Sequence, residues 1–339
     1  MRRRILTIAI ICPVVAAFCA ATLLSCARPT KDLIVWSYDS FVSEYGPGQK
    51  LAELFGKETG VQVGFVSKGD GGQLLSALAF EADRPVADIA IGLDNLLLPK
   101  ALALGLFSPY RPKGLDAVDQ VLRIDSSNRL VPFDYGYFAI IYDSTRTKEL
   151  PTSLADFTKG AYAKQLILMD PRTSTPGLGF LGWTKAVYGR GLSAYWKLLV
   201  PSILVMTPGW DTGYGLFTSG EAPFVLSYTT SPAYHREVEK TERYKVLPLA
   251  EGNPLEVELA GILKGAKNRS NAERFMDFLL SAEAQAILPT TQWMYPARSD
   301  TPLPPGFRDE DRPVKVLTID AEGLVAEAAG LMAEIARTR

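Results

Sequence analysis

The chain has 339 residues, of which 47% are hydrophobic, and its 36 basic residues nearly balance its 37 acidic ones. This length suffices for one large domain or two lobes, and the composition is that of a globular protein. No long run of like charges occurs, so the charge pattern gives no support to a nucleic-acid-binding role.

The first 25 residues have the layout of a secretory signal. Arg2–Arg4 form a short basic segment, the run 5–21 is almost wholly apolar, and Ser25 is followed by Cys26. A small residue before a cysteine at the cleavage point is typical of bacterial lipoproteins. We therefore predict a signal peptide over 1–25 and a lipid attached to Cys26. The alternative is an ordinary signal peptide or an uncleaved anchor.

Cysteine and histidine are scarce in the predicted mature chain. Cys12 and Cys19 lie within the signal, so only Cys26 remains, and His235 is the single histidine. Disulfides, a thiolate nucleophile, a thiolate metal site and a histidine metal triad are therefore excluded, and we expect no metal site. The loss of three arginines leaves 33 basic against 37 acidic residues in the mature chain.

The first part of the mature chain alternates strands and helices. Strands are predicted at 33–37, 61–66 and 88–91, and helices at 48–59 and 73–82. This order predicts a parallel sheet with right-handed crossovers, in an α/β fold.

The later part of the chain continues the alternation. Strands are predicted at 138–142, 166–169, 224–227 and 256–262, and helices at 177–188, 192–198, 211–218, 271–279, 282–287 and 321–336. The strand at 256–262 carries Glu256 and Glu258, and these predict a half-exposed strand. In such folds ligands bind at the carboxyl ends of strands, where helix N-termini point.

Three predicted helices begin with residues that suit anion binding. Asp70-Gly71-Gly72, Thr175-Pro176-Gly177 and Gly209-Trp210-Asp211 each open a helix, and free N–H groups at helix starts attract anions. Ser174 and Thr175 add hydroxyl donors. Together the three starts could form a phosphate or carboxylate pocket, although each alone is an ordinary helix start.

Aromatic residues form a second group of candidates. Tyr38, Trp210, Tyr234 and Trp293 are flanked by Ser, Thr, Pro or Gly, which favours the edge of a loop over the core. Such rings can stack on a flat ligand or hold a cation against their faces. Three carboxylates could complement a cation as well: Asp39, Asp94 and Asp134. For Asp94 a role in a short turn or as a helix cap is the alternative.

Templates for catalysis do not fit the chain. No G-x-S-x-G elbow accompanies His235, and the Walker loop, the G-x-G-x-x-G fingerprint and a Tyr-Tyr pair are absent from the sequence. We therefore predict a non-enzymatic binding protein in which His235 has a structural hydrogen-bonding role.

Longer motifs resemble those of a known family. The longest are DPRTSTPG at 170–177 and SYTTSPAYH at 227–235. The matching segments are 38–41, 46–48, 70–71, 92–95, 132–138, 170–179, 209–210, 214–217, 227–235 and 293–296. These segments resemble the bacterial periplasmic thiamine-binding proteins, the substrate-binding components of thiamine ABC importers.

The resemblance implies a type II periplasmic-binding-protein fold, with two α/β lobes, a hinge and a ligand cleft between them. It places 26–130 and 260–288 in the first lobe, and 131–259 and 289–339 in the second. It implies a protein that is a monomer, needs no cofactor and has no catalytic residue. Its expected protein partners are an ABC permease and the ATPase subunit of that permease. The lipid would hold it on the periplasmic face of a membrane.

The resemblance also implies the binding residues. Thiamine or its phosphates would bind between the lobes, with the ester oxygen or phosphate near Asp70, Gly71, Ser174, Thr175 and Trp210. The rings would contact Tyr38, Tyr234 and Trp293, with Tyr228 close by. The sequence leaves open whether thiamine, its monophosphate or its diphosphate is preferred.

Three other functions stay open. The first is binding of another small phosphorylated or cationic ligand on the same scaffold. The second is thiamine cleavage, since the lytic thiaminases share this fold, but those enzymes rely on a nucleophilic cysteine that the mature chain lacks. The third is an adhesive surface lipoprotein.

Overall fold

The computed structural model describes residues 32–147 and 149–337, and these form one compact unit. The predicted signal peptide and lipid site at Cys26 lie outside the described residues. Among the described residues, none of the helices has the length and apolar character needed to cross a membrane.

The N-terminal strands and helices confirm the predicted β-α-β-α-β run. They are β1 (Leu33–Ser37), α3 (Gly48–Thr59), β2 (Val63–Ser67), α4 (Gly71–Phe80) and β3 (Ile89–Asp94). β1 pairs with both β2 and β3 in parallel, as the crossovers require. Helix α3 ends where Gly60 takes a left-handed conformation with φ of 76°, which glycine adopts without strain.

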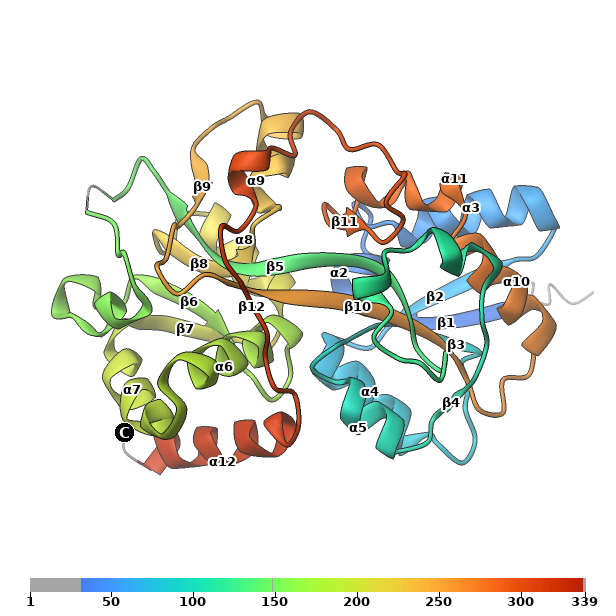
Figure 1. Ribbon diagram of the computed structural model, residues 1–339, viewed down its shortest axis with the longest axis horizontal. Coiled ribbons are helices and arrows are strands. Elements are labelled where there is room, and N and C mark those ends of the chain that lie inside the picture. The colour runs from blue at the N-terminus through green and yellow to red at the C-terminus, as the bar shows by residue number, and fades with distance from the viewer. Residues whose placement is uncertain (1–31, 148, 338–339) are drawn as a thin grey trace, which may run out of the picture. The chain divides into compact units, whose positions relative to one another are not determined.

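Two long strands run from this first lobe into a second one. Figure 1 shows β5 (Val131–Asp143) and β10 (Asn253–Leu263) crossing between the two groups of elements. They pair antiparallel with each other, and the sheet order is β2-β1-β3-β10-β5-β8-β6-β7. The two crossing strands therefore join the lobes and form the centre of the sheet.

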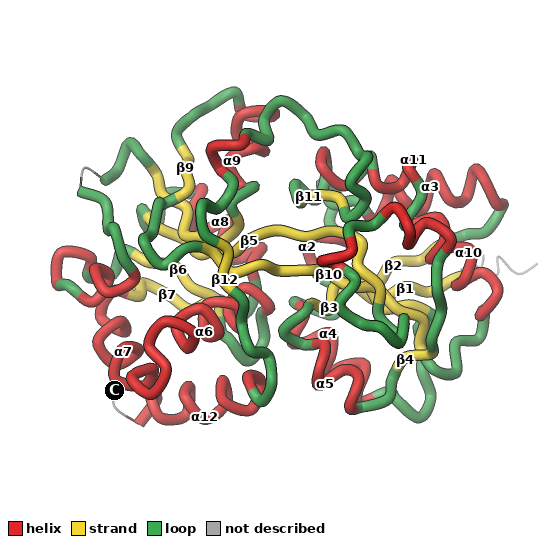
Figure 2. The backbone as a smooth tube through the Cα atoms, in the orientation of Figure 1, coloured by secondary structure: helices red, strands yellow, loops and turns green. Residues whose placement is uncertain are grey.

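The second lobe contains another parallel segment covered by helices. Its main elements are β6 (Leu166–Met169), α6 (Thr175–Tyr188), α7 (Leu192–Leu199), β7 (Ile203–Thr207), α8 (Trp210–Thr218) and β8 (Phe224–Tyr228). β6 pairs in parallel with β7 and β8. Figure 2 shows helices on the outside of both lobes with strands between them. The C-terminal helix α12 (Leu324–Arg337) packs on α6 and α7.

Shorter elements complete the described chain. The helices are α2 (Asp39–Val42), α5 (Leu98–Ala103), α9 (Ser231–Tyr234), α10 (Arg269–Leu279) and α11 (Ala282–Gln285). The strands are β4 (Phe107–Ser108), β9 (Tyr244–Val246), β11 (Tyr295–Pro296) and β12 (Val316–Leu317). The sequence did not predict α2, α5, β7 or these four short strands.

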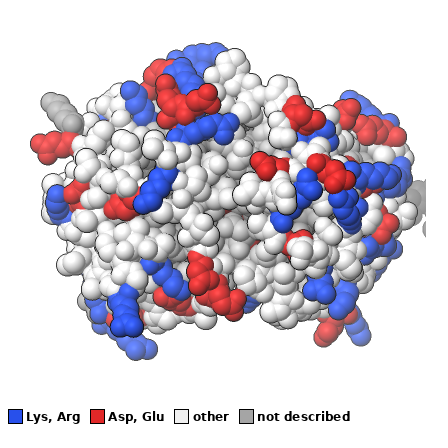
Figure 3. Space-filling model, in the orientation of Figure 1, with Lys and Arg blue, Asp and Glu red and all other residues white. Residues whose placement is uncertain are grey.

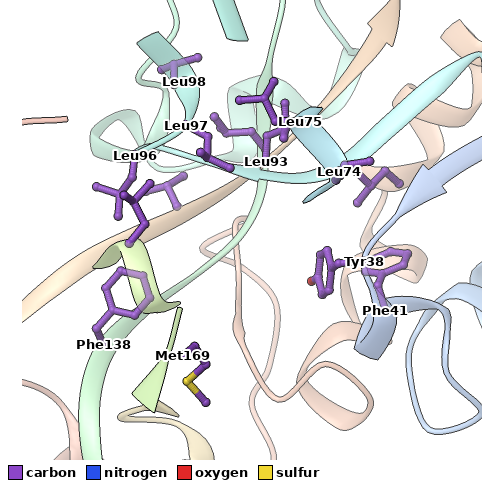
Figure 4. Packing of buried hydrophobic residues seen from close by; sticks show 14 of the residues in the cluster. Tyr38, Phe41, Leu74, Leu75, Leu93, Leu96, Leu97, Leu98, Phe138 and Met169 are labelled. Atoms are coloured by element: carbon purple, nitrogen blue, oxygen red, sulfur yellow. The ribbon is translucent and has the colours of Figure 1, made fainter. Parts of the chain in front are cut away.

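The hydrophobic core of the first lobe reaches the crossing strands through a chain of rings. Phe41 makes edge contacts with Tyr38 and Phe133, with ring centroids 5.6 and 5.9 Å apart. Figure 4 shows Tyr38 and Phe41 next to each other, with Leu74 of α4 nearby. Tyr38, which follows β1 directly, is thus fixed by packing on its apolar side.

The prediction that 256–262 is half-exposed is wrong. Glu256 and Glu258 are 0% and 7% exposed, because Tyr228 and Tyr38 from other elements lie over this face and donate hydrogen bonds to them. Alternating polar residues indicate a solvent-facing side only when that side is not covered by other parts of the protein. The predicted lobe boundaries stay a prediction; β5 begins at Val131, and β10 continues through the expected boundary after Leu259.

Candidate functional site

A cavity of about 530 Å³ contains most of the residues predicted to bind a ligand. Seven of the nine line it, and they come from both lobes: Tyr38, Asp70, Thr175, Trp210, Tyr228, Tyr234 and Trp293. Gly71 and Ser174 are not part of its lining, although both adjoin residues that are. A volume in this range is typical of small-molecule sites.

Asp70 joins the three predicted helix starts. It is the N-cap of α4, where its side chain accepts from Gly71 N at 2.6 Å and its own N–H donates to Gln73. The same carboxylate accepts from Thr175 N at 3.2 Å and from Thr175 Oγ1 at 3.3 Å. It also accepts from Trp210 N at 2.9 Å. The N–H groups that open α6 and α8 therefore donate to a carboxylate of the first lobe.

Gly71 and Ser174 support this junction without lining the cavity. A Cβ on Gly71 would lie 2.2 Å from Thr175 Oγ1, so only glycine allows the helices to approach this closely. Ser174 is buried and is the N-cap of α6, with its Oγ accepting from Gly177 N at 3.5 Å. In the structure Ser174 thus serves its own helix.

The aromatic residues form two groups on the cavity wall. Trp293 meets Tyr234 edge to face at 5.5 Å and lies parallel to Phe307. Trp293 also has a φ of 58°, a conformation that non-glycine residues rarely adopt and that often marks functional sites. In the other group Trp210 stacks on Tyr214 at 4.8 Å, and its indole N–H donates to Ser227 Oγ at 2.8 Å.

Tyr38, Tyr228 and Gln292 form a hydrogen-bonded polar floor with Glu256 and Glu258 of the crossing strand β10. Tyr38 Oη donates to Glu258 Oε2 at 2.6 Å and accepts from the side-chain amide of Gln292. Tyr228 Oη donates to Glu256 Oε1 at 3.3 Å. Glu258 and Gln292 line the cavity. The sequence reading missed both, because their contacts with Tyr38 span more than 200 residues of chain.

Burial shifts the acid-base behaviour of this floor. It raises the pKa of Glu258 to about 7 and holds the pKa of Glu256 well above its ordinary value. Burial, with the nearby carboxylates, also raises the pKa values of Tyr38 and Tyr228, so both phenols stay neutral hydrogen-bond donors.

The three aspartates suggested as cation partners have different settings. Asp39 is exposed and lines the cavity, whereas Asp94 and Asp134 are buried and lie outside its lining. Asp94 Oδ1 accepts from Leu96 N and Leu97 N, which confirms the short-turn role; the N-cap of α5 is Leu97, so Asp94 does not cap that helix.

His235 has the structural role predicted for it. The ring is buried and makes hydrogen bonds with Tyr214 Oη at 2.8 Å and Glu239 Oε2 at 2.7 Å. Burial lowers the pKa of His235, which favours the neutral ring. Within residues 32–147 and 149–337, no group of three or more His, Cys, Asp or Glu side chains is placed to hold a metal ion.

The charge of the cavity is one-sided. Its lining includes five acidic residues and, over the part of the chain that the structure describes, no lysine or arginine: Asp39, Asp70, Asp211, Glu239 and Glu258. By contrast, Figure 3 shows both signs of charge interspersed on the outer face in view, around a mostly uncharged centre. A cavity of this kind favours cationic ligands over anionic ones.

Comparison with known proteins identifies the family. Residues 84–321 match the bacterial extracellular solute-binding proteins. The chain belongs to this family. It is 46% identical to the thiamine-binding periplasmic protein of Brucella abortus over 305 residues, which cover 89% of this chain and 90% of that protein. The corresponding protein of Escherichia coli is 38% identical over 319 residues, covering 93% and 97%.

A solved structure agrees with these relatives. A periplasmic thiamin binding protein superimposes on this solute-binding protein with a TM-score of 0.83 and 38% identity, over 90% of this chain and 95% of that one. The predicted resemblance and fold class are thereby confirmed. The names of these relatives describe binding proteins, not enzymes.

Proposed function

We propose that this protein binds thiamine outside the cytoplasm and delivers it to an ABC permease. The observation that carries the proposal is the cavity, in which aromatic rings surround a space whose described lining has acidic residues and no basic ones. Thiamine is flat, aromatic and permanently cationic, so it suits ring faces and carboxylates together. The names of the relatives support the same ligand.

The geometry supports one orientation of the ligand. The rings would lie near Trp293 and Tyr234, whose edge-to-face pair leaves aromatic surface facing the cavity. The hydroxyethyl end would lie near Asp70, Thr175 and Trp210. There Asp70 can accept from the free hydroxyl of thiamine, whereas a phosphate would meet like charge.

Isothermal titration calorimetry of the purified mature domain with thiamine tests the proposal. We expect one ligand per chain and a dissociation constant well below the micromolar range. Native mass spectrometry of the freshly purified protein should show a mass increase equal to that of thiamine or one of its phosphates. A protein that carries no such mass and gives no heat with any of these ligands would rule the proposal out.

We propose further that Cys26 carries a lipid that holds the protein on the periplasmic face of a membrane. The Leu23-Leu24-Ser25-Cys26 run after an apolar segment supports this. Cys26→Ser should release the protein from the membrane fraction or stall its processing, while the folded domain keeps its affinity for thiamine. A wild-type protein whose intact mass shows no lipid would contradict the anchor.

Delivery to a permease has its own test. Deleting the gene in the source bacterium should abolish uptake of labelled thiamine at low external concentration, and a plasmid copy should restore it. We propose no catalytic role for this protein. Incubation with thiamine should therefore leave the ligand chemically intact, as chromatography of the recovered ligand would show.

A further inference from the structure

Three carboxylates lie side by side on the strands below the cavity. In the register of the sheet, Glu258 of β10 pairs with Asp94 of β3 on one side and with Asp134 of β5 on the other. Directly paired residues in antiparallel strands share one face of the sheet, and like charges in such pairs are destabilising. All three side chains are buried, so solvent and salt do little to screen the repulsion.

Glu256 extends this row to four acids, which we call the acid cluster: Asp94, Asp134, Glu256 and Glu258. Glu256 lies two residues from Glu258 on β10 and is wholly buried. Residues two apart on a strand share a face. Oε2 of Glu256 and Oδ2 of Asp94 are buried without a hydrogen-bond partner, and the carboxyl of Asp134 faces that of Glu258. Buried polar atoms of this kind are rare in proteins and require a compensating group.

Glu258 is the member of the acid cluster that reaches the cavity. One of its oxygens accepts from Tyr38 Oη, and Tyr38 is itself held by Gln292. Among the described residues that line the cavity none is a lysine or arginine. The charge that balances the cluster therefore has to be either a proton or a cationic ligand.

We propose that Glu258 determines the selectivity of the cavity for a positively charged flat ligand, and that binding of this cation displaces one proton from the acid cluster into solvent. The proposal rests on the proposed function and adds to it the group that recognises the charge of the ligand. The balance is simple: the protonated protein and the cation give the complex and one free proton. No covalent bond apart from the O–H bond changes.

The acid-base behaviour of the cluster supports this exchange. Burial raises the pKa of Glu258 to about 7, and it holds the pKa values of the other three acids well above their ordinary range. The groups that face Glu258 from other elements are neutral or acidic: Tyr38, Asp70, Asp94, Asp134 and Tyr228. Near neutral pH the cluster therefore holds protons that a neighbouring cation would expel.

The affinity for thiamine should therefore increase with pH. Below neutral pH the cluster is protonated, so the cation must displace a proton and binds more weakly. As pH rises through the pKa of Glu258 the affinity for thiamine should increase, by up to about tenfold per pH unit while a full proton is exchanged.

Calorimetry in buffers of different ionisation enthalpy measures the displaced proton directly. At pH 6.5 we expect wild-type protein to release between about half a proton and one proton per thiamine bound. Glu258→Gln keeps the size of the side chain but removes its charge, and should reduce this number at least by half. Glu53→Gln is the matched control, because it removes one negative charge from the exposed face of α3, outside the cavity lining. It should retain the wild-type proton release.

A pair of fragments tests the recognition of charge separately. The neutral hydroxyethyl-methylthiazole of thiamine and its N-methylated thiazolium cation differ by little except charge. By NMR titration, wild-type protein should bind the cation at least about tenfold better, and Glu258→Gln should reduce that ratio to below about threefold.

The outcomes separate this inference from the proposed function. No proton release by wild-type protein in any buffer, or equal affinities for the two fragments, would overturn the role of the cluster even if thiamine binds tightly. A Glu258→Gln variant that keeps wild-type selectivity would overturn the role of Glu258. If that variant does not fold, the wild-type proton count and fragment ratio still decide. Failure to bind thiamine, with charge selectivity for the fragments intact, would overturn the proposed ligand alone.

Discussion

Replacing Asp70 with alanine should both destabilise the protein and loosen the contact between its lobes. Asp70 belongs to the first lobe, yet its carboxylate accepts from Thr175 N, Thr175 Oγ1 and Trp210 N in the second. Two other contacts cross the cleft nearby, from Gln73 N to Thr173 O at 3.2 Å and from Tyr45 to Asp211. Asp70 alone, however, serves helix starts in both lobes.

The size of the effect follows from these bonds. Loss of an N-cap costs about 1 kcal/mol, and each hydrogen bond to a charged group contributes about 1.5–3 kcal/mol. The N–H and O–H groups that lose Asp70 can donate to water once the lobes separate, which offsets part of this cost. We therefore expect the free energy of unfolding to fall by about 2–4 kcal/mol. Unfolding entropy is about 2.1 cal/mol/K per residue, so a domain of about 300 residues should show a Tm lower by about 3–6 °C.

Two measurements on the ligand-free protein check this prediction. Differential scanning calorimetry of Asp70→Ala should show the lower Tm, and small-angle X-ray scattering should show a larger radius of gyration than for wild type. Asp70→Asn keeps one oxygen acceptor, so its Tm and radius of gyration should lie between those of Asp70→Ala and wild type. It should also bind thiamine monophosphate no more weakly than wild type, since it removes a negative charge beside the phosphate. If Asp70→Ala keeps both the wild-type Tm and scattering curve, the carboxylate does not link the lobes.

Three further predictions concern the cavity. Trp293→Ala and Tyr234→Ala should each weaken thiamine binding by about 1–3 kcal/mol in calorimetry without unfolding, by analogy with bases stacked on aromatics; affinities within twofold of wild type for both would contradict it. Thr175→Ala removes a hydroxyl that donates to Asp70, so it should weaken thiamine and its monophosphate by similar factors in calorimetry; a loss at least about tenfold larger for the monophosphate would show that this hydroxyl binds the phosphate instead. The raised pKa of Glu258 means that the folded state binds the extra proton, so its stabilising contribution is complete below pH 4.5 and is lost as pH rises through about 7. Denaturant unfolding without ligand should show less loss of stability over this range in Glu258→Gln than in wild type.

The helix starts at the site could be predicted because their chemistry is local. An N-cap needs only a suitable residue just before a helix, and Asp70 caps α4 as predicted. For α6 the sequence favoured Thr175 as the cap, whereas the structure has Ser174 as the cap and Thr175 as the first helical residue. The sequence also indicated that the three starts could meet in one cleft. It could not indicate that Asp70 itself would accept from the other two helices, because that depends on how the lobes lie together.

The polar floor escaped prediction for a different reason. Glu256 and Glu258 alternate with apolar residues, as in a strand with one face in water. The face that carries them is covered by Tyr38 and Tyr228, and the contact between Tyr38 and Glu258 spans 220 residues of chain, so no local pattern reveals the burial. The full length of β5 was missed as well, since Asp134 and Gly136 interrupt its apolar pattern.

Asp70 and Glu258 both line the cavity, but the protein stabilises their negative charges to different extents. Asp70 accepts from three residues, so its charge is already stabilised by the protein. Glu258 has one phenol donor and acidic neighbours on both flanking strands. A cation gains more beside the less compensated group, because nearby donors have not already reduced its negative potential. The charged ring of the ligand should therefore lie towards the crossing strands, while its hydroxyl end lies towards Asp70. Since the crossing strands join the lobes, recognition of the charge would take place at the hinge, where ligand binding and lobe closure can be coupled.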